Sequence, residues 1–386
     1  MTVVKNGKLS KNVDVLKDVQ RKINAIFSEI SGSLFEREEE IELTLVSILS
    51  QSSLLFVGPP GTAKSFALEK VINQIEGAQK FLWLMGKFTE PDEIFGPVDI
   101  LSLKQGIRKR NTEWKLPKAH FVFLDEFFKC STAIGNALLR IVNERVYNDG
   151  SVEVKVPLRT LVAASNEYNV DGEMGAMFDR FILRKEINYI SSSDNILKLI
   201  KTSGNPSSQP ITTITLKELD IATEASSKVS ISEEVYNIIF KIVSKCFENN
   251  VRPSDRRLCN INKIVKSYAY LLGSEEVLDK HLSILSHLLW VDPSSHIPIV
   301  RNIVEEFSNT EKYKLNNLKQ QYESILKEIP SKAVEQTVKK YGDVQVRLLN
   351  IKNQIEVLEE SSSKKAFMEK LTETLGFIGN KIITLH

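Results

Sequence analysis

The chain has 386 residues, of which 42% are hydrophobic and 26% charged, as expected for a soluble globular protein of two or three domains. The formal net charge of +2 provides no general attraction to nucleic acid or to anionic membranes. Cys130, Cys246 and Cys259 lack CxxC spacing, which argues against a disulfide framework or a zinc site. The sequence shows neither a signal peptide nor an apolar run of membrane-spanning length, so we expect a cytoplasmic protein without a membrane span.

Helical periodicity over residues 12–50 predicts two helices joined by a loop at residues 32–37. This loop lies just before a candidate nucleotide-binding strand. In a nucleotide-binding module its apolar side chains, Leu34 and Phe35, would be well placed to pack on adenine. The alternative is a simple connection with two buried apolar residues.

From Leu54 the sequence reads LLFVGPPGTAKS, an apolar run followed by a Gly/Pro-rich loop that opens a helix. Glycines let successive backbone N–H groups surround phosphate oxygens, and the helix N-terminus adds partial positive charge. Lys64 would reach the β- and γ-phosphates, and the Ser65 hydroxyl would ligate Mg²⁺. Ala63 replaces the glycine that usually precedes the lysine, but a small side chain can be accommodated there. An ordinary Gly/Pro turn is the alternative.

The residues that we expect to contact the nucleotide in this loop and the following helix are Gly58, Pro59, Pro60, Gly61, Thr62, Ala63, Lys64, Ser65 and Phe66. We predict that this helix continues to Ile75 and that residues 81–85 form a short buried strand. Residues 86–118 are rich in Gly, Pro and charge and form an excursion from the core. The excursion contains a basic run, Lys104 to Arg110, which is either a solvated face or a contact with nucleic acid or a partner.

Residues 120–126 read HFVFLDE, an apolar strand that ends in two adjacent carboxylates. Ligands gather at the carboxyl ends of strands in open parallel sheets. There Asp125 could hold Mg²⁺, and Glu126 could polarise an attacking water molecule. Strand-ending acids are common, but this pair follows a candidate phosphate-binding loop. The two features together favour an ATPase.

A helix is predicted over residues 131–144, followed by a hairpin whose turn is Asn148-Asp149-Gly150. Residues 161–164 form another buried strand that ends near Asn166. This amide could orient the attacking water between the γ-phosphate and Glu126. An ordinary strand-terminating Asn is the alternative.

Helical patterns continue to the end of the chain and divide it into three parts: 1–190, 191–307 and 308–386. In the second part we predict a loop over residues 204–210 and a helix that begins with a capping box of Ser230 and Glu233. In the third part, apolar residues recur at helical spacing and form short apolar seams, which predict antiparallel helices packed on each other.

Several blocks of sequence, in one order, resemble the MoxR branch of the AAA+ ATPases, and the match is closest to the RavA-type subfamily. The blocks are GPPGTAKS, LMGKFTEPDEIFGPVDI, FVFLDEFFKC, IVNERVYNDG, LVAASNE, FDRF, PSDRR and LLWVDPSS. The alanine before the lysine is typical of that subfamily. The resemblance covers about residues 15–300 and implies an AAA+ P-loop core, a parallel sheet flanked by helices, with an all-α lid and a C-terminal helical extension.

The resemblance also implies roles for particular residues. Asn166 matches the sensor-1 position. Arg180 matches the arginine finger that acts on the neighbouring subunit's γ-phosphate, with Arg184 as the second choice. Arg256 matches the sensor-2 position, with Arg257 close behind. Residues 86–118 match the helix-2 insert and residues 146–157 the pre-sensor-1 hairpin, both of which would face substrate.

We therefore predict a MoxR/RavA-type ATPase that binds ATP and Mg²⁺ and hydrolyses ATP between subunits of a homo-hexameric ring to remodel a protein partner. By resemblance, the usual partner carries a von Willebrand factor A (vWA) domain. One alternative is a nucleic-acid motor on the same core, which the near-neutral composition disfavours. The other is a nucleotide-gated scaffold that acts through its C-terminal helices.

Overall fold

The computed structural model describes residues 3–150, 152–167, 175–202, 211–308, 310–327, 337–358 and 362–385. The chain divides into two compact units, Met1–Arg301 and Asn302–His386, which we describe separately. The predicted loop at residues 204–210 lies outside the described residues.

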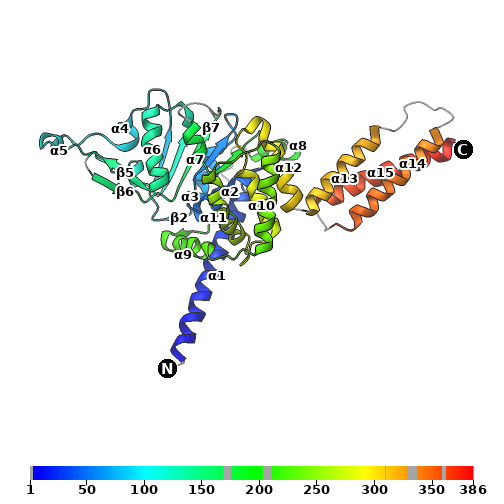
Figure 1. Ribbon diagram of the computed structural model, residues 1–386, viewed down its shortest axis with the longest axis horizontal. Helices are drawn as coiled ribbons and strands as arrows, with labels where there is room; N and C mark the ends of the chain where they lie inside the picture. Colours follow the sequence, from blue (N-terminus) through cyan, green and yellow to red (C-terminus); the bar gives the residue numbers. More distant parts are fainter. Residues whose placement is uncertain are drawn as a thin grey trace. The chain divides into compact units, whose positions relative to one another are not determined.

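A five-stranded parallel sheet forms the centre of the first unit, as predicted (Figure 1). The strands lie in the order β3-β4-β7-β1-β8, with bounds β3 Lys80–Leu84, β4 Phe121–Asp125, β7 Thr160–Ser165, β1 Leu54–Val57 and β8 Leu183–Glu186. Strands β1, β4 and β7 are almost wholly buried, which their unbroken apolar sequences explain. Because all the strands are parallel, the segments that follow β1, β4 and β7 emerge at one edge.

β3 differs from its prediction as a buried strand. It forms the edge of the sheet, where β4 is its one partner among the described strands, and Leu84 is 66% exposed. An apolar run of this length does not distinguish an edge strand from a central one.

Helix α2 (Glu38–Leu49) is the most buried helix of the core, and it contacts β1, β7 and β8 as well as other helices. α1 (Val3–Ser31) starts earlier than predicted and buries Val19, Ile23, Ile26 and Ile30 at helical spacing. The core also contains α3 (Lys64–Ile72), η2 (Phe127–Lys129), α6 (Thr132–Glu144) and α7 (Gly175–Arg180).

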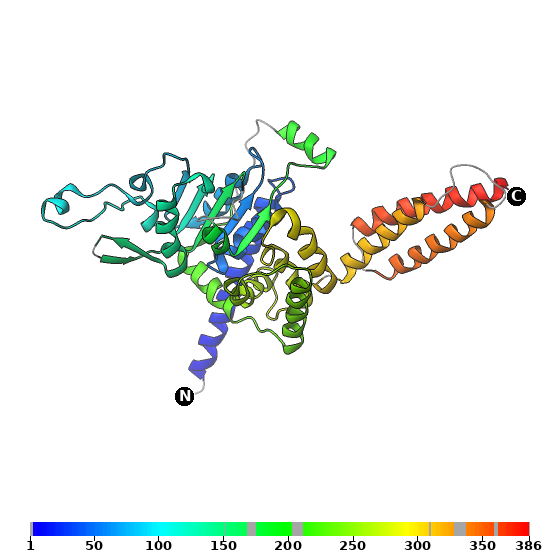
Figure 2. The ribbon, with the colours of Figure 1, turned by 45° about the horizontal axis from the view of Figure 1, so that its top comes forward.

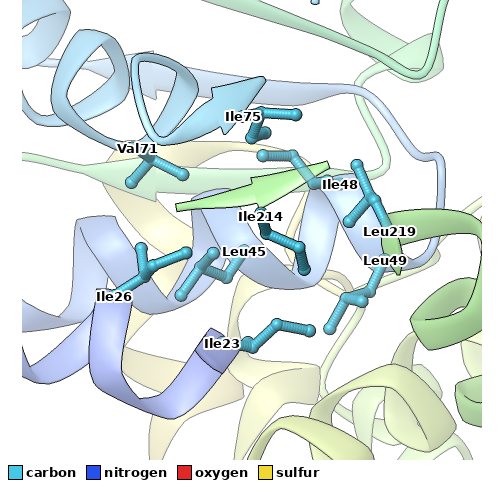
Figure 3. Close-up of a pocket in the computed structure, with 9 residues that line it drawn as sticks. All are labelled: Ile23, Ile26, Leu45, Ile48, Leu49, Val71, Ile75, Ile214 and Leu219. Carbon is cyan, nitrogen blue, oxygen red and sulfur yellow. The ribbon is translucent and has the colours of Figure 1, made fainter. Parts of the chain in front are cut away.

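Helix α3 ends at Ile72, so its predicted extension to Ile75 is wrong. Instead β2 (Ile75–Glu76) pairs in parallel with β9 (Ile214–Thr215), and the N–H of Ile214 donates to the carbonyl of Gln74. Apolar side chains from α1, α2, α3, β2, β9 and α9 line a small cavity at this junction (Figure 3). Burying Ile75 and Ile214 in this layer explains why the chain leaves the helix.

The lid is helical, as predicted. Its elements are α8 (Ser193–Thr202), α9 (Leu216–Ser227), α10 (Glu233–Glu248), α11 (Asp255–Leu271), η4 (Asp279–His287) and α12 (Pro293–Ser308). The predicted capping box at Ser230 is wrong, because the Ser232 side chain accepts from the N–H of Val235. The N–H of Ser230 instead donates to the Glu275 carbonyl, which draws this residue into a β-bridge.

The predicted insert contains α4 (Pro91–Phe95), α5 (Ile100–Lys104) and η1 (Leu116–Lys118). The predicted hairpin is present as antiparallel β5 (Val146–Asp149) and β6 (Val152–Lys155). Figure 2 shows the insert and the hairpin extending from the same side of the core.

The second unit contains α13 (Thr310–Lys327), α14 (Thr337–Glu356) and α15 (Ser362–Leu385). The predicted seams meet in one apolar cluster, which includes Tyr322, Leu348, Ile355 and Leu371. Met368 and Leu375 of α15 pack against this cluster and are only partly buried. Among the described residues, no helix is both long enough and apolar enough to cross a membrane.

Leu348 and Leu349 provide a matched test of this cluster, because Leu348 is fully buried and Leu349 is 43% exposed. Leu348→Ala should lower the free energy of unfolding of the second unit by about 2–5 kcal/mol, through lost burial and a residual cavity. Leu349→Ala should change it by less than about 0.5 kcal/mol. Thermal unfolding followed by circular dichroism would measure both.

Tryptophan fluorescence supplies an internal control, because Trp83, Trp114 and Trp290 all lie in the first unit. The fluorescence transition should be the same in both variants. Equal destabilisation by the two substitutions would contradict the assigned core.

Candidate nucleotide site

The loop between β1 and α3 has the close backbone packing that a phosphate site needs. At Gly58 a Cβ atom would lie 2.1 Å from the carbonyl oxygen of Ile187, so only glycine fits there. The N–H of Gly58 donates to the carbonyl of Ser165 at 3.0 Å, which ties the loop to the end of β7. Ala63 has φ +61°, so an alanine adopts the left-handed conformation that glycine adopts most readily.

Lys64 lies at the start of α3, and its side chain is buried. Its ammonium donates to the carbonyls of Gly58 and Pro59 at 2.7 and 2.9 Å and to Asn166 Oδ1 at 3.1 Å. Burial lowers the pKa of Lys64, and the charges of Asp125 and Glu126 offset part of this shift. A buried cation held by neutral acceptors fits a site for phosphate oxygens.

Asn166, at the end of β7, joins Lys64 to Glu126. Its Nδ2 donates to Glu126 Oε1 at 2.5 Å, while its Oδ1 accepts from Lys64. Since an ammonium only donates and a carboxylate only accepts, these partners fix the orientation of the amide. The structure therefore brings together three of the predicted catalytic residues.

Glu126 follows β4 with φ +51°, a left-handed conformation that is uncommon outside glycine. Its Oε2 is buried without a hydrogen bond, although the Lys129 ammonium lies 3.4 Å away. A buried carboxylate oxygen with unused acceptor capacity fits a role in accepting a proton from water.

The residues predicted to hold Mg²⁺ also lie at this edge of the sheet. Asp125 ends β4, and its Oδ1 accepts from the N–H of Glu126 at 2.9 Å. Ser65 is partly exposed in the first turn of α3. A carboxylate and a hydroxyl are oxygen ligands of the kind that Mg²⁺ takes together with nucleotide phosphates. The donor set therefore fits the metal.

Leu34 and Phe35 are half-buried in the loop before α2. The next side chain, Arg37, is buried and was not predicted to belong to the site. Its guanidinium donates to the carbonyls of Thr62 at 3.1 Å and Asn188 at 2.9 Å. Arg37 therefore connects this loop to the phosphate-binding loop and to the segment after β8, a role that local sequence did not indicate.

The predicted arginines lie around Asp179, near the end of α7. Asp179 accepts from Ser254 at 2.7 Å and from Arg256 at 2.5 Å, so the candidate sensor-2 arginine pairs with α7. The partly buried Arg180 guanidinium donates to the carbonyl of Ala176 at 2.7 Å. Burial, and then the nearby Arg256 charge, lower the pKa of Arg180.

Arg184 and Arg257 are fully buried, unlike Arg180 and Arg256. Both donate to the carbonyl of Trp290, Arg184 at 3.1 Å and Arg257 at 2.5 Å. The Arg184 guanidinium also lies over the ring of Phe178, 3.8 Å from its centroid. The contact with Trp290 gives Arg184 a structural role between core and lid, and Arg257 has the same role through its Nε, which lies 3.3 Å from Asp179 Oδ1.

A parallel sheet with a phosphate-binding loop after β1, carboxylates after β4, a polar residue after β7 and a helical lid defines the AAA+ ATPase fold. The sequence model of the MoxR domain in the MoxR-vWA-beta-propeller ternary systems matches residues 21–223, and an AAA lid domain model matches residues 234–304. The chain belongs to the MoxR family of AAA+ ATPases.

Several known proteins are similar to this chain. Two uncharacterized proteins of Methanocaldococcus jannaschii are among them. The first is 39% identical over 76% of this chain and 76% of its own, and the second is 33% identical over 92% of this chain and 97% of its own. Chaperone MoxR1 of Mycobacterium tuberculosis is 29% identical over 44% of this chain and 45% of its own. The crystal structure of a proposed ATPase from Cytophaga hutchinsonii matches with a TM-score of 0.62 at 16% identity, covering 77% of this chain and 98% of its own.

Ala63→Gly should increase the free energy of unfolding of the first unit by up to about 1 kcal/mol, because glycine relieves the left-handed alanine. Ala67→Gly, in the interior of α3, should instead decrease it by about 1 kcal/mol or more, because glycine weakens a helix and the buried methyl group is lost. Urea unfolding followed by tryptophan fluorescence would measure both. Destabilisation by both substitutions would contradict the strained conformation of Ala63.

Proposed function

We propose that this protein hydrolyses ATP at the interfaces between subunits of a hexameric ring and uses the cycle to remodel or activate a protein partner. The hydrogen-bonded series Lys64–Asn166–Glu126, with Asp125 beside it, carries the proposal. A cation, an amide and a carboxylate thus lie side by side, and ATP hydrolysis requires such groups to bind phosphate, orient water and accept its proton.

Each predicted residue has a role in this mechanism. Gly58, Pro59 and Pro60 shape the loop, the backbone N–H groups of residues 61–66 surround the phosphates, and Leu34 and Phe35 pack on adenine. Lys64 binds the β- and γ-phosphates. Ser65 and Asp125 would hold Mg²⁺, which would supply positive charge against the phosphate oxygens.

Glu126 accepts the proton of the attacking water, while Asn166 holds that water in line. Arg180 is our choice for the arginine finger, since Arg184 is fully buried against Phe178 and Trp290. Arg256 would act as sensor 2 after leaving Asp179.

The proposed partner is a protein that carries a vWA domain. The matched family model, which is named for systems that combine MoxR, vWA and beta-propeller components, supports this proposal. The remodelling activity is supported by the similarity to a protein named as a chaperone. The RavA-type subfamily and the cytoplasmic location stay predictions from the sequence.

Glu126→Gln should keep ATP binding but reduce turnover by about 10²–10⁴-fold, because the amide cannot accept the proton from water. Glu248→Gln, which removes an exposed carboxylate at the end of α10, should leave both unchanged. Phosphate release and the affinity for a fluorescent ATP analogue would measure the two effects. Normal turnover by Glu126→Gln would exclude Glu126 as the base, and no turnover by the wild-type protein would favour the scaffold alternative.

Arg180→Ala and Glu126→Gln subunits, each inactive alone, should regain turnover when mixed. A site with an intact Glu126 would then face a neighbour that supplies Arg180, and such trans-acting arginines contribute about 10³–10⁵-fold in rate. As a control, subunits with both substitutions should not restore Arg180→Ala subunits, because every neighbour lacks the arginine. The absence of recovery in the first mixture would argue against a shared site.

A further inference from the structure

An open pocket of about 310 Å³ lies between the insert, α6 and the hairpin, away from the residues assigned to ATP. Figure 2 shows these elements together at one end of the first unit. Two contacts join insert and hairpin: the N–H of Arg110 donates to Asp149 Oδ1 at 2.7 Å, and a Cβ on Gly150 would lie 2.1 Å from the carbonyl oxygen of Arg108. The pocket is thus built on packed backbone.

Of the two cations that line this pocket, Arg108 and Arg110, one forms no ion pair among the described residues. Asp149 is buried and accepts from the backbone of Arg110. The Arg110 guanidinium pairs with Asp92 and donates to the carbonyl of Gly96. Arg108 is exposed and forms no ion pair among the described residues, so its guanidinium is available to an anion.

The remaining surfaces of the pocket suit an organic anion. The buried ring of Tyr147 stacks on Phe95 with centroids 5.3 Å apart. Burial raises the pKa of Tyr147. The guanidinium charges of Arg110 and Arg108 act in the opposite direction and the carboxylates of Asp149 and Asp92 in the same direction as burial, so charges of both signs lie close to the phenol. Ala133 and Ala137 of α6 also line the pocket and leave room for a side chain.

We propose that this pocket binds a carboxylate of the protein partner, with Arg108 as its counter-charge and Tyr147 as a hydrogen-bond donor. This inference rests on one part of the proposed function, namely that the protein binds a polypeptide partner. Large apolar side chains of the insert, Ile100, Leu101 and Ile107, are 49–72% exposed. Exposed apolar groups in the same insert as Arg108 suit an acidic, apolar polypeptide better than the phosphates of a nucleic acid.

The pocket is connected to the catalytic edge through α6. The segment just before α6 carries Lys129, whose ammonium lies 3.4 Å from Glu126 Oε2. A peptide that binds in the pocket and contacts Ala133, in the first turn of α6, would therefore displace the helix that follows the catalytic carboxylate. We expect the bound peptide to change the rate of ATP turnover.

The test uses the full-length, nucleotide-free protein and fluorescein-labelled peptides of alternating Leu and Glu residues with amidated C-termini. Fluorescence anisotropy should show at least about tenfold tighter binding of the Glu peptide than of the matching Gln peptide. Arg108→Gln should remove this preference. Lys104→Gln, which removes an exposed charge of the same insert outside the pocket, should retain it.

Further binding measurements identify the source of the carboxylate and the kind of molecule that occupies the pocket. A Gln peptide with a free C-terminus that binds as tightly as the Glu peptide would assign the pocket to a chain terminus and support the proposal. Ala133→Leu should weaken binding by filling the pocket, without changing the melting temperature. Equal losses in Arg108→Gln and Lys104→Gln, or tighter binding of single-stranded RNA than of the Glu peptide, would overturn it.

Phosphate release separates this inference from the proposed function. Peptide binding without ATP turnover in the wild-type protein would uphold the pocket and refute the ATPase. Turnover that no peptide alters, together with no Arg108-dependent binding, would refute the pocket and leave the ATPase intact. Thermal unfolding of each variant would verify its fold.

Discussion

The amide of Asn166 connects the two halves of the candidate site, because one end accepts from Lys64 and the other donates to Glu126. This geometry depends on the parallel sheet, in which β7 lies between β1 and β4. The three strands deliver a cation, an amide and a carboxylate to the same edge. A change in strand order would separate these groups even if every motif were kept.

Much of the fold and of this edge could be predicted from the sequence, because local patterns encode both. The apolar strand before Gly58, the paired acids after β4 and the hairpin turn at Gly150 each depend on neighbouring residues. A few neighbouring residues are enough to determine a short buried strand or a tight backbone turn. The apolar seams of the second unit were local in the same way.

Contacts between distant segments were not predictable. Arg37 bonds to Thr62 and Asn188, and no nearby residue indicates either partner. Nor does the sequence distinguish the partly buried Arg180 from the fully buried Arg184 four positions later, since only the lid supplies the Trp290 carbonyl. The early end of α3 has the same origin, because its cause, pairing with β9, comes from far along the chain.

Glu36 precedes Arg37 and holds a different part of the chain. Its carboxylate accepts from the backbone N–H groups of Ser191 and Ser192 and from Asn195, and these bonds lower its pKa to about 2. Two consecutive side chains thus fasten the phosphate-binding loop and the start of α8. An adenine base that displaces the loop at residues 32–37 on entering would move both attachments together. The amphipathic helix α8 would then respond to bound nucleotide without touching it.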